Sequence, residues 1–477
     1  MTRFIPLIVP FLMLAIADVA LAGEVLFASA RPDVPIAGAD RVYTADQFSN
    51  TVSVVDPSSN TLLGTIRLGD PQPANFSPLY RGQVLVHGMG FAPDGRTIAV
   101  VSVGSNAVSF IDTATNTVKA TTYVGRSPHE AFFTPDGREI WVTVRGENYV
   151  SVIDAMTFKE IAQVSTPNGP GMTIFSPDGR LAYVCSSFTP LLTVFNVGSR
   201  KQVGQVPQPS PFCPNIAASP DGRQVWYTLK DIGKVVAIDA RPPFVTLKVI
   251  DTGPITNHVN FVDTADGAFA YVTVGGMNEV KVFRRDSFAL VATIPVGKLP
   301  HGIWPSGDSS RIYVGLENSD GLAVIDTHTH KVITTIPIGQ APQALTYVPN
   351  AVPQGLGITG LQPLDVAGRS TELTMAPRGW TGLPPTSVTL FEQGFIQVLQ
   401  AAATGLRPDA GYQLGLIDSR GAIETLADFK TNPAGAAIVN AAGPIRQIVA
   451  PTTALEPRKL VIVEAGAAPG QPVQTQR

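Results

Sequence analysis

The chain has few cysteines, histidines and charged residues. Among its 477 residues, 2 are cysteine, 6 are histidine and 15% are charged. Two isolated cysteines exclude the clustered motifs of covalent haem attachment and structural zinc sites. The formal net charge is −3 and no basic patch stands out, so we expect no nucleic-acid partner. A Gly-x-Ser-x-Gly elbow, a P-loop and a dinucleotide fingerprint are absent as well.

Long apolar runs are also missing, except near the first residue. Residues 4–17 are largely apolar, follow Arg3 and lead to the small residues Ala20 and Ala22. This pattern predicts a signal peptide over residues 1–22, followed by an N-terminal extension over residues 23–40. An uncleaved anchor is the alternative, which the prolines and the aspartate of this stretch disfavour. We therefore expect a periplasmic or secreted protein without a transmembrane anchor in its mature chain.

Glycine and proline are abundant, with 44 and 41 residues, and they punctuate an internal repeat. Frames similar to "PHEAFFTPDGREIWV" start at residues 86, 128, 170, 213, 258, 300 and 342, which are 42 to 45 residues apart. A second motif, similar to "VSVID", recurs seven times in step with the first. Each unit contains four strand-like runs, which is typical of one propeller blade. The aspartates of the Pro-Asp-Gly turns are expected to form turns rather than to catalyse: Asp94, Asp136, Asp178 and Asp221.

The repeat predicts an all-β fold in which a seven-bladed β-propeller spans residues 41–350. The array begins at a second strand, "RVYTADQ", and ends at a first strand, "ALTYVP". Seven blades close only if this last run pairs with the first three strands. That pairing would join the two ends of the array and remove an open sheet edge.

The repeat resembles the YVTN family of bacterial propeller proteins. The resemblance rests on "AYVTVGGMNEVKVF", "VGRSPHEAFFTPDGREIWV" and "SNAVSFIDTATNTVKATTYVG", and it covers about residues 41–350. It implies a seven-bladed propeller that is secreted or exposed on the cell surface. It implies little about activity, because the family includes lactonase-like enzymes, surface-layer proteins and binding proteins.

Residues after the repeat predict a second, smaller domain. Residues 351–375 are rich in proline and glycine and indicate a linker. Residues 376–466 contain β-prone runs between turn signals, which predicts a small β-sandwich-like domain, and the tail 467–477 is expected to be disordered. The run "IQVLQAAATGL" is compatible with a helix instead of a strand.

Four of the six histidines should meet at one mouth of the propeller channel, because they open first strands in four blades. They are His87, His129, His258 and His301. Two interpretations compete. Each imidazole could bond the backbone of a neighbouring blade and help to close the ring. Alternatively, several imidazoles could converge on a ligand or a metal.

A metal centre is one form of the second interpretation. Histidine binds copper and zinc, and Cys213 lies beside the same mouth, where a thiolate would favour copper(I). The candidate ligands are therefore His87, His129, His258, His301 and Cys213. No cofactor is the simpler expectation. Cys213 has a competing role, since a disulfide with Cys185 would join two blades if the distance permits.

Charged residues from neighbouring loops should surround the same mouth. The predicted ligand-binding residues are the four histidines together with Arg126, Arg145, Glu147, Lys230 and Glu317. Mixed charge around a cup suits a small molecule or a peptide. The leading hypothesis is an exported, non-enzymatic protein that binds a small molecule, a peptide or a cell-envelope partner. The alternatives are a metal-binding propeller and a lactonase-like hydrolase that uses His129 or His301 as base and Arg126 or Arg145 for an oxyanion.

Overall fold

The computed structural model describes residues 35–70, 84–377, 384–393, 396–445, 458–466 and 471–477. The predicted signal peptide and most of the predicted N-terminal extension lie outside these ranges. The described chain is almost entirely β-structure, with two short 3₁₀ turns, η1 (Gly275–Met277) and η2 (Asp365–Gly368). None of the helices in these ranges has the length and apolar character needed to cross a membrane.

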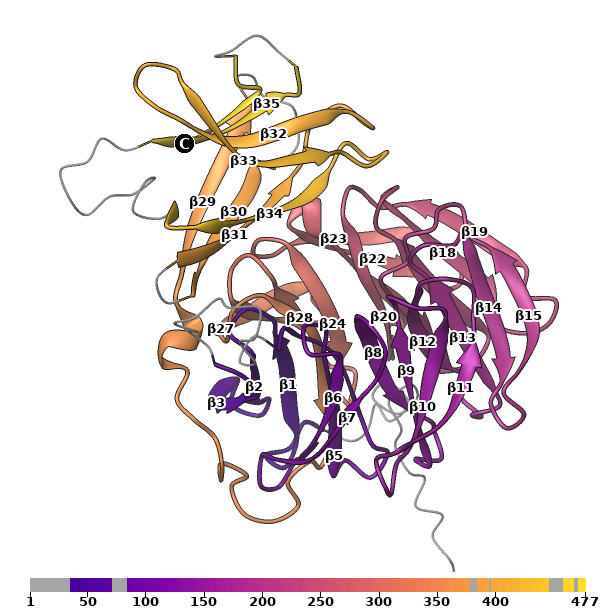
Figure 1. Cartoon of the computed structure of the whole chain (residues 1–477). Helices are drawn as coiled ribbons and strands as arrows, with labels where there is room; N and C mark the ends of the chain where they lie inside the picture. Colours follow the sequence, from indigo (N-terminus) through magenta and orange to yellow (C-terminus); the bar gives the residue numbers. More distant parts are fainter. Residues whose placement is uncertain (1–34, 71–83, 378–383, 394–395, 446–457, 467–470) are drawn as a thin grey trace, which may run out of the picture.

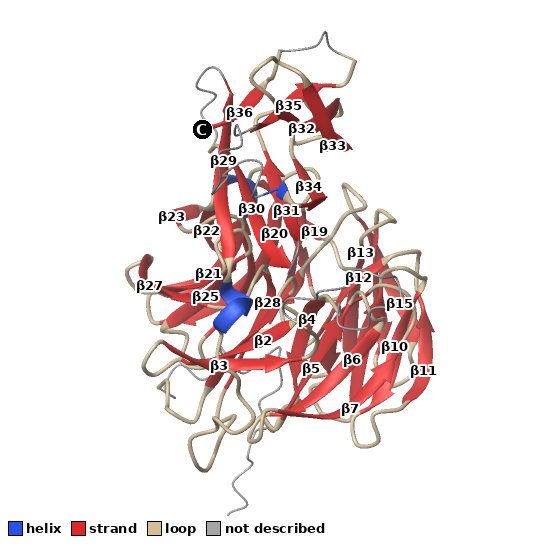
Figure 2. Ribbon diagram, turned by 60° about the vertical axis from the view of Figure 1, so that its left-hand side comes forward, coloured by secondary structure: helices blue, strands red, loops and turns tan. Residues whose placement is uncertain are grey.

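Seven four-stranded antiparallel sheets surround one axis, which confirms the predicted propeller (Figures 1 and 2). Four of them are β28 (Pro342–Val348) with β1 (Arg41–Asp46), β2 (Thr51–Asp56) and β3 (Thr61–Arg67); β4 (Val86–Phe91), β5 (Thr97–Ser102), β6 (Ala107–Asp112) and β7 (Thr117–Tyr123); β8 (Pro128–Phe133), β9 (Glu139–Val144), β10 (Tyr149–Asp154) and β11 (Glu160–Ser165); and β12 (Pro170–Phe175), β13 (Leu181–Ser186), β14 (Leu191–Asn196) and β15 (Lys201–Pro207).

The remaining three blades follow the same order. They are β16 (Ile216–Ala218), β17 (Gln224–Leu229), β18 (Lys234–Asp239) and β19 (Thr246–Asp251); β20 (Thr256–Thr264), β21 (Gly267–Val274), β22 (Glu279–Arg284) and β23 (Leu290–Pro295); and β24 (Pro300–Pro305), β25 (Arg311–Leu316), β26 (Gly321–Asp326) and β27 (Lys331–Pro337). The first strands of neighbouring blades contact one another around the axis, and most of their residues are buried.

The ring closes as the strand count predicts. The last propeller strand, β28, pairs antiparallel with β1, and Tyr43 lies opposite Thr346. One blade thus combines the two ends of the array, so that no sheet edge is left open at the junction. The Pro-Asp-Gly turns also behave as expected. Gly137 has φ +71°, and the Asp136 carboxylate accepts hydrogen bonds from Thr134 Oγ1 at 2.6 Å and from the Arg138 amide at 3.1 Å.

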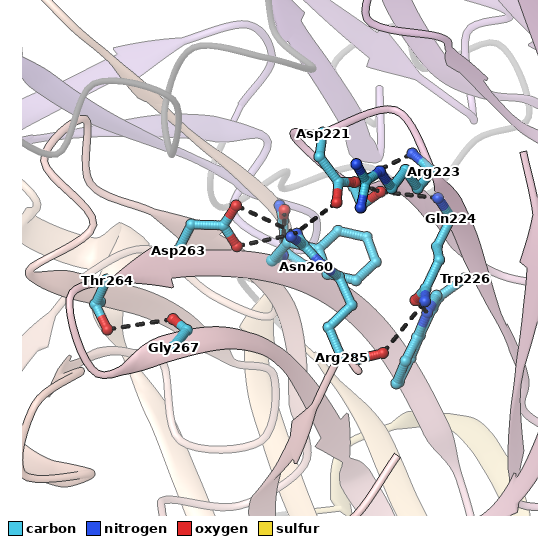
Figure 3. A network of polar contacts seen from close by, with 11 residues as sticks. Asp221, Arg223, Gln224, Trp226, Asn260, Asp263, Thr264, Gly267 and Arg285 are labelled. Carbon is cyan, nitrogen blue, oxygen red and sulfur yellow. Dashed lines mark hydrogen bonds and ion pairs between the residues drawn. The ribbon is translucent and has the colours of Figure 1, made fainter. Parts of the chain in front are cut away.

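A buried arginine links two neighbouring blades (Figure 3). Arg285, which follows β22, is 8% exposed. Its Nη1 lies 2.9 Å from Asp263 Oδ1 in its own blade, and its Nη2 lies 3.2 Å from Asp221 Oδ2 in the preceding blade. Its guanidinium also lies over the ring of Phe261, 5.9 Å from the centroid. The planar guanidinium can contact both carboxylates at once, which a lysine could not do as well.

Cys185 and Cys213 form a disulfide with a Cα–Cα distance of 6.0 Å. Cys185 lies in β13 and Cys213 precedes β16, so the bond joins two consecutive blades. Both residues are fully buried. The thiolate that the copper hypothesis requires at Cys213 is therefore consumed by the disulfide.

The C-terminal domain is a single eight-stranded sheet that rolls up until its edge strands approach each other. The spatial order is β33 (Ile423–Lys430), β32 (Gly411–Ile417), β35 (Lys459–Glu464), β36 (Gln474–Gln476), β29 (Ser370–Pro377), β30 (Thr386–Gln393), β31 (Ile396–Ala403) and β34 (Ala437–Gly443). The run whose sequence is compatible with a helix is strand β31, because its residues pair with β30 on one side and β34 on the other.

Two boundaries differ from those expected from the sequence. The predicted linker 351–375 ends early, since β29 begins at Ser370. Before that, its residues lie against the propeller: the Asn116 side chain donates to the Gly357 and Thr359 carbonyls, and Thr65 pairs with Gln362. The tail 467–477 is not wholly disordered, because Gln474–Gln476 form β36 between β29 and β35. Backbone pairing partners far away in the sequence explain both differences, and composition does not reveal them.

The C-terminal domain is seated on one end of the propeller (Figure 1). Phe48 and Phe391 pack across the junction with ring centroids 4.8 Å apart. The Asn318 side chain donates to Ser387 Oγ at 3.1 Å, and Lys298 Nζ lies 2.7 Å from Glu372 Oε2. Ile255 and Leu299 of the propeller pack with Ala402 and Ala436 of the C-terminal domain. This end of the propeller is the one that carries the histidines.

Candidate functional site

The four histidines come together at the channel mouth, as their frame positions imply. Each lies near the start of a first strand, and each is at least nine-tenths buried. The ring centroids of His87 and His129 are 4.5 Å apart, those of His258 and His301 are 4.6 Å apart, and those of His87 and His301 are 6.4 Å apart. The strands that carry them are tightly packed, since a Cβ at Gly88 would lie 2.0 Å from the His129 carbonyl oxygen.

Two of these imidazoles bond the backbone of the next blade. His129 Nδ1 lies 2.7 Å from the Gly171 carbonyl oxygen, and His301 Nδ1 lies 2.6 Å from that of Gln343. A carbonyl only accepts, so Nδ1 carries the proton in both rings. These bonds connect equivalent positions of consecutive blades, 42 residues apart in each case. They match the interpretation in which the histidines help to close the ring.

His258 has a different environment. The Asn215 side chain accepts from the Val259 amide through Oδ1 at 2.8 Å, which leaves its Nδ2 to donate to His258 Nδ1 at 3.2 Å. His258 Nδ1 is therefore the acceptor, and the proton of the neutral ring lies on Nε2. Among the described residues, His258 Nε2 and His87 Nδ1 are buried nitrogens without a hydrogen-bond partner.

The imidazoles are neutral at physiological pH. Burial, together with the nearby Lys230 ammonium, lowers the pKa of His258 to about 3. Burial and the Arg145 guanidinium lower the pKa of His87 and of His129 well below the ordinary value. The pKa of His301 is also lowered well below the ordinary value, mainly by burial and to a smaller extent by His258 and Lys230. The mouth thus places two cations near four uncharged rings.

The described residues do not fit a metal centre. No group of three or more His, Cys, Asp or Glu side chains in these ranges is arranged to hold a metal ion. His129 and His301 direct Nδ1 to backbone carbonyls, and Cys213 is oxidised to a disulfide. The residues proposed as copper or zinc ligands are thus engaged in other bonds or are too few to form such a site.

Below the ring, the channel narrows to a cavity of about 30 Å³, lined by Glu130, Met172, Asn215, His258 and Trp304, among others. This volume is close to that of one water molecule. Glu130 Oε2 accepts from the Met89 amide at 3.2 Å, and burial raises the pKa of Glu130 to about 8.

A much larger cavity, of about 500 Å³, lies between the mouth and the C-terminal domain, and we call it the mouth cleft. Pockets of this size accommodate small organic molecules. The propeller contributes Gln47, Phe212, Lys230, Asp231, Ile255, Glu317 and Gln343 to its wall, and the C-terminal domain contributes Gln400, Asp409, Lys430, Thr431, Asn432 and residues 436–438.

The wall of the mouth cleft contains a buried, two-domain polar cluster. Gln400 Nε2 donates to Glu317 Oε1 at 2.8 Å, and Glu317 and Gln400 are only 3% and 4% exposed. Burial raises the pKa of Glu317, while the Lys230 charge opposes that shift. Burial also lowers the pKa of Lys230, with Glu317 opposing. Lys230 and Glu317 therefore stabilise each other's charged forms in a place where water is largely excluded.

Not all predicted site residues belong to this site. Lys230 and Glu317 line the mouth cleft, and Arg145 lies close enough to the histidines to lower their pKa. Arg126 and Glu147 instead pair with each other, with Nε and Oε1 2.7 Å apart, and the Arg126 side chain is 73% exposed. The loop positions of these two residues are as expected, but their side chains are directed to each other rather than to the axis.

Sequence reasoning missed the half of the cleft that the C-terminal domain provides. Gln400, Asp409, Lys430 and Asn432 lie outside the repeat, so no frame position indicated them. One signal was available. Gln397 and Gln400 interrupt the apolar run of β31, and both are at least nine-tenths buried. Buried amides in a strand indicate polar partners nearby, and the partner of Gln400 is Glu317 of the propeller.

Comparisons with known proteins bear on the fold alone. No family model and no curated protein matches the chain. A solved structure titled "Kuenenia stuttgartiensis Hydrazine Synthase" aligns with 56% of this chain and 89% of that chain, with 20% identity and a TM-score of 0.49. The crystal structure of a functionally unknown protein from Desulfotomaculum acetoxidans DSM 771 aligns with 64% of this chain and 98% of that chain, with 16% identity and a TM-score of 0.54.

Proposed function

We propose that this chain is an exported propeller protein of the YVTN type that binds a small polar molecule in the mouth cleft and does not transform it. One observation carries the proposal: a cleft of about 500 Å³ is lined by both domains, and its wall holds the buried Glu317 carboxylate beside the half-buried Lys230 and Asp231. Buried charges at a cavity wall are costly for stability alone, and they are typical of sites that recognise a polar ligand.

The size and shape of the mouth cleft favour a small molecule over a folded partner. A protein partner would need a surface of roughly 800 Å² on each side, whereas the histidine end of the channel is covered by the C-terminal domain. The apolar side chains of Phe212, Ile255 and Ile438 line the cavity beside its polar groups. Such a mixture provides contact area together with a few orienting contacts.

The arrangement of the histidines supports binding rather than hydrolysis. A general base must approach the proton that it removes. His129 and His301 are buried beneath the mouth and are oriented by carbonyls of the next blade. Neither residue lines the mouth cleft. Export is supported by the N-terminal sequence pattern and by the Cys185–Cys213 disulfide, because disulfides persist in oxidising compartments.

A ligand screen tests the proposal. Purified protein would be titrated with amino acids, polyamines, dicarboxylates, sugars and lactones, with thermal shift and calorimetry as readouts. We expect one class to bind, and the Lys230→Met variant to weaken that binding while Arg126→Met, on the exposed rim pair, leaves it unchanged. Turnover of a lactone, or binding that neither Lys230→Met nor Glu317→Gln affects, would contradict the proposal. N-terminal sequencing of the exported protein should begin at Gly23.

A further inference from the structure

Three side chains of the mouth cleft carry oxygens without a hydrogen-bond partner. They are Asp231 Oδ1, Glu317 Oε2 and Gln400 Oε1, and all three atoms are buried. The other oxygen of each carboxylate is occupied: the Ser210 hydroxyl donates to Asp231 Oδ2, and Gln400 Nε2 donates to Glu317 Oε1. A buried polar atom without a partner costs free energy, so several at one cavity indicate that a ligand supplies what is missing.

The missing partner is a donor, since all three unpaired atoms are acceptors. The orientation of the Gln400 amide supports this assignment. If the amide were turned around, its oxygen would face the Glu317 carboxylate, and two acceptors would repel each other. The observed orientation therefore leaves Gln400 Oε1 as the unpaired atom. Asp231 and Glu317 belong to different blades and Gln400 to the C-terminal domain, so no single loop accounts for the set.

The charges around the cleft agree with a cationic donor. Asp231, Glu317 and Asp409 are acidic, whereas Lys230 and Lys430 are basic, so the wall is negative by one charge in total. An ammonium group has three N–H donors and no acceptor, which matches three unpaired oxygens. A guanidinium would instead need a planar pair of acceptors for its fork of donors.

We propose that Asp231, Glu317 and Gln400 form a subsite for the protonated primary amino group of a small organic ligand. This inference rests on the proposed binding function and specifies its ligand class. The three oxygens belong to side chains of the cleft wall and are covered in this structure, so binding of an ammonium there requires neighbouring side chains to move. Lys230 and Lys430 remain available for a carboxylate on the same ligand, which makes amino acids and their derivatives the best candidates.

Matched probes test the subsite. Calorimetry would compare n-butylamine, butyrate and n-butanol, which are four-carbon compounds with different head groups, followed by γ-aminobutyrate, which carries both charges. We expect butylamine and γ-aminobutyrate to bind and butyrate and butanol to bind at least about tenfold more weakly. Glu317→Gln should weaken amine binding by about 10- to 100-fold, because it removes the charge while it retains the contact with Gln400.

Control variants separate this inference from the proposed function. Glu147→Gln removes an equivalent charge from the exposed rim and should leave the affinity unchanged. If Glu317→Gln fails to fold, Asp231→Asn provides the same test. Butyrate or a sugar that binds in a Lys230-dependent manner, while amines do not, would overturn the amine subsite and leave the binding function intact. If no compound of any class binds, both are overturned.

Discussion

Gln400 of the C-terminal domain donates a hydrogen bond of 2.8 Å to Glu317 of the propeller, across 83 residues of sequence. The bond fixes the amide, holds one carboxylate oxygen and leaves the other oxygen without a partner. It lies at the wall of the mouth cleft, where the two domains meet. The C-terminal domain is thus part of the candidate site, and the propeller alone would present only an open mouth.

Alanine substitutions of the channel histidines should destabilise the fold to different degrees. His301→Ala should lower the free energy of unfolding the most, by about 1–3 kcal/mol, because the Gln343 carbonyl loses its imidazole donor. No hydroxyl replaces that donor, since the strand position that is Thr143 in the blade of His129 is Gly315 in the blade of His301. His129→Ala should cost less, because Thr143 Oγ1 still donates to the Gly171 carbonyl at 3.0 Å. His87→Ala, whose Nδ1 has no partner, should cost the least. Denaturant unfolding would measure the order, and equal losses would contradict it.

Glu130→Gln should change how stability depends on pH. Burial raises the pKa of Glu130 to about 8 in the folded protein, from an ordinary value of 4.5. The folded state then binds more protons than the unfolded state between these values, so Glu130 causes stability to fall as the pH rises from about 4.5 to 8.

The substituted glutamine cannot ionise, yet its side-chain carbonyl can still accept from the Met89 amide. We expect the variant to exceed the wild type by about 2–4 kcal/mol at pH 8 and to match it below pH 5. Thermal and denaturant unfolding between pH 4.5 and 8.5 would measure the difference. A gap that is constant with pH would show that Glu130 does not titrate in this range.

Arg285→Met should loosen the contact between two blades. The substitution keeps much of the apolar stem over Phe261 but leaves Asp221 and Asp263 without their shared cation. Because both carboxylates are partly solvated, we expect a loss of about 1–3 kcal/mol rather than that of a fully buried pair. Arg241→Met is the matched control, since its pair with Asp239 is exposed, and it should be silent. Similar effects of the two variants would argue against the inter-blade role.

Removal of the disulfide should lower stability without removing the fold. A bond that closes 28 residues is worth about 3 kcal/mol, so the Cys185→Ala, Cys213→Ala double variant should unfold at a lower denaturant concentration. A reductant alone should leave the native protein unchanged, because both cysteines are fully buried. Rapid reduction without denaturant would contradict this burial.

The fold could be predicted because the same pattern of strands and turns recurs in seven units of the sequence. The Pro-Asp-Gly turns and the alternation of the strands depend only on residues close together in the sequence. Because the array starts at a second strand and ends at a first strand, β28 had to pair with β1. The convergence of the four histidines followed from the same geometry. The hydrogen-bond partners of those histidines could not be predicted. The bond from His129 to Gly171 depends on the spacing between two blades, which a sequence does not specify to a few tenths of an ångström.

The second half of the site could not be predicted, because it depends on how two domains dock. Contacts such as Phe48 with Phe391 and Asn318 with Ser387 join residues that share no repeat position and no motif. The same reason explains the short strand β36, whose partners β29 and β35 lie far away in sequence. The pairing of Arg126 with Glu147 could not be predicted either, because a loop position fixes the backbone and not the partner of the side chain.

A crystal structure of the protein soaked with the tightest-binding compound of the ligand screen tests the central claim most directly. We predict electron density for the compound in the mouth cleft, in contact with Glu317 from the propeller and Gln400 from the C-terminal domain. Density instead in the cavity of about 540 Å³ that Arg180, Asp221 and Arg241 line among the Pro-Asp-Gly turns would contradict the claim.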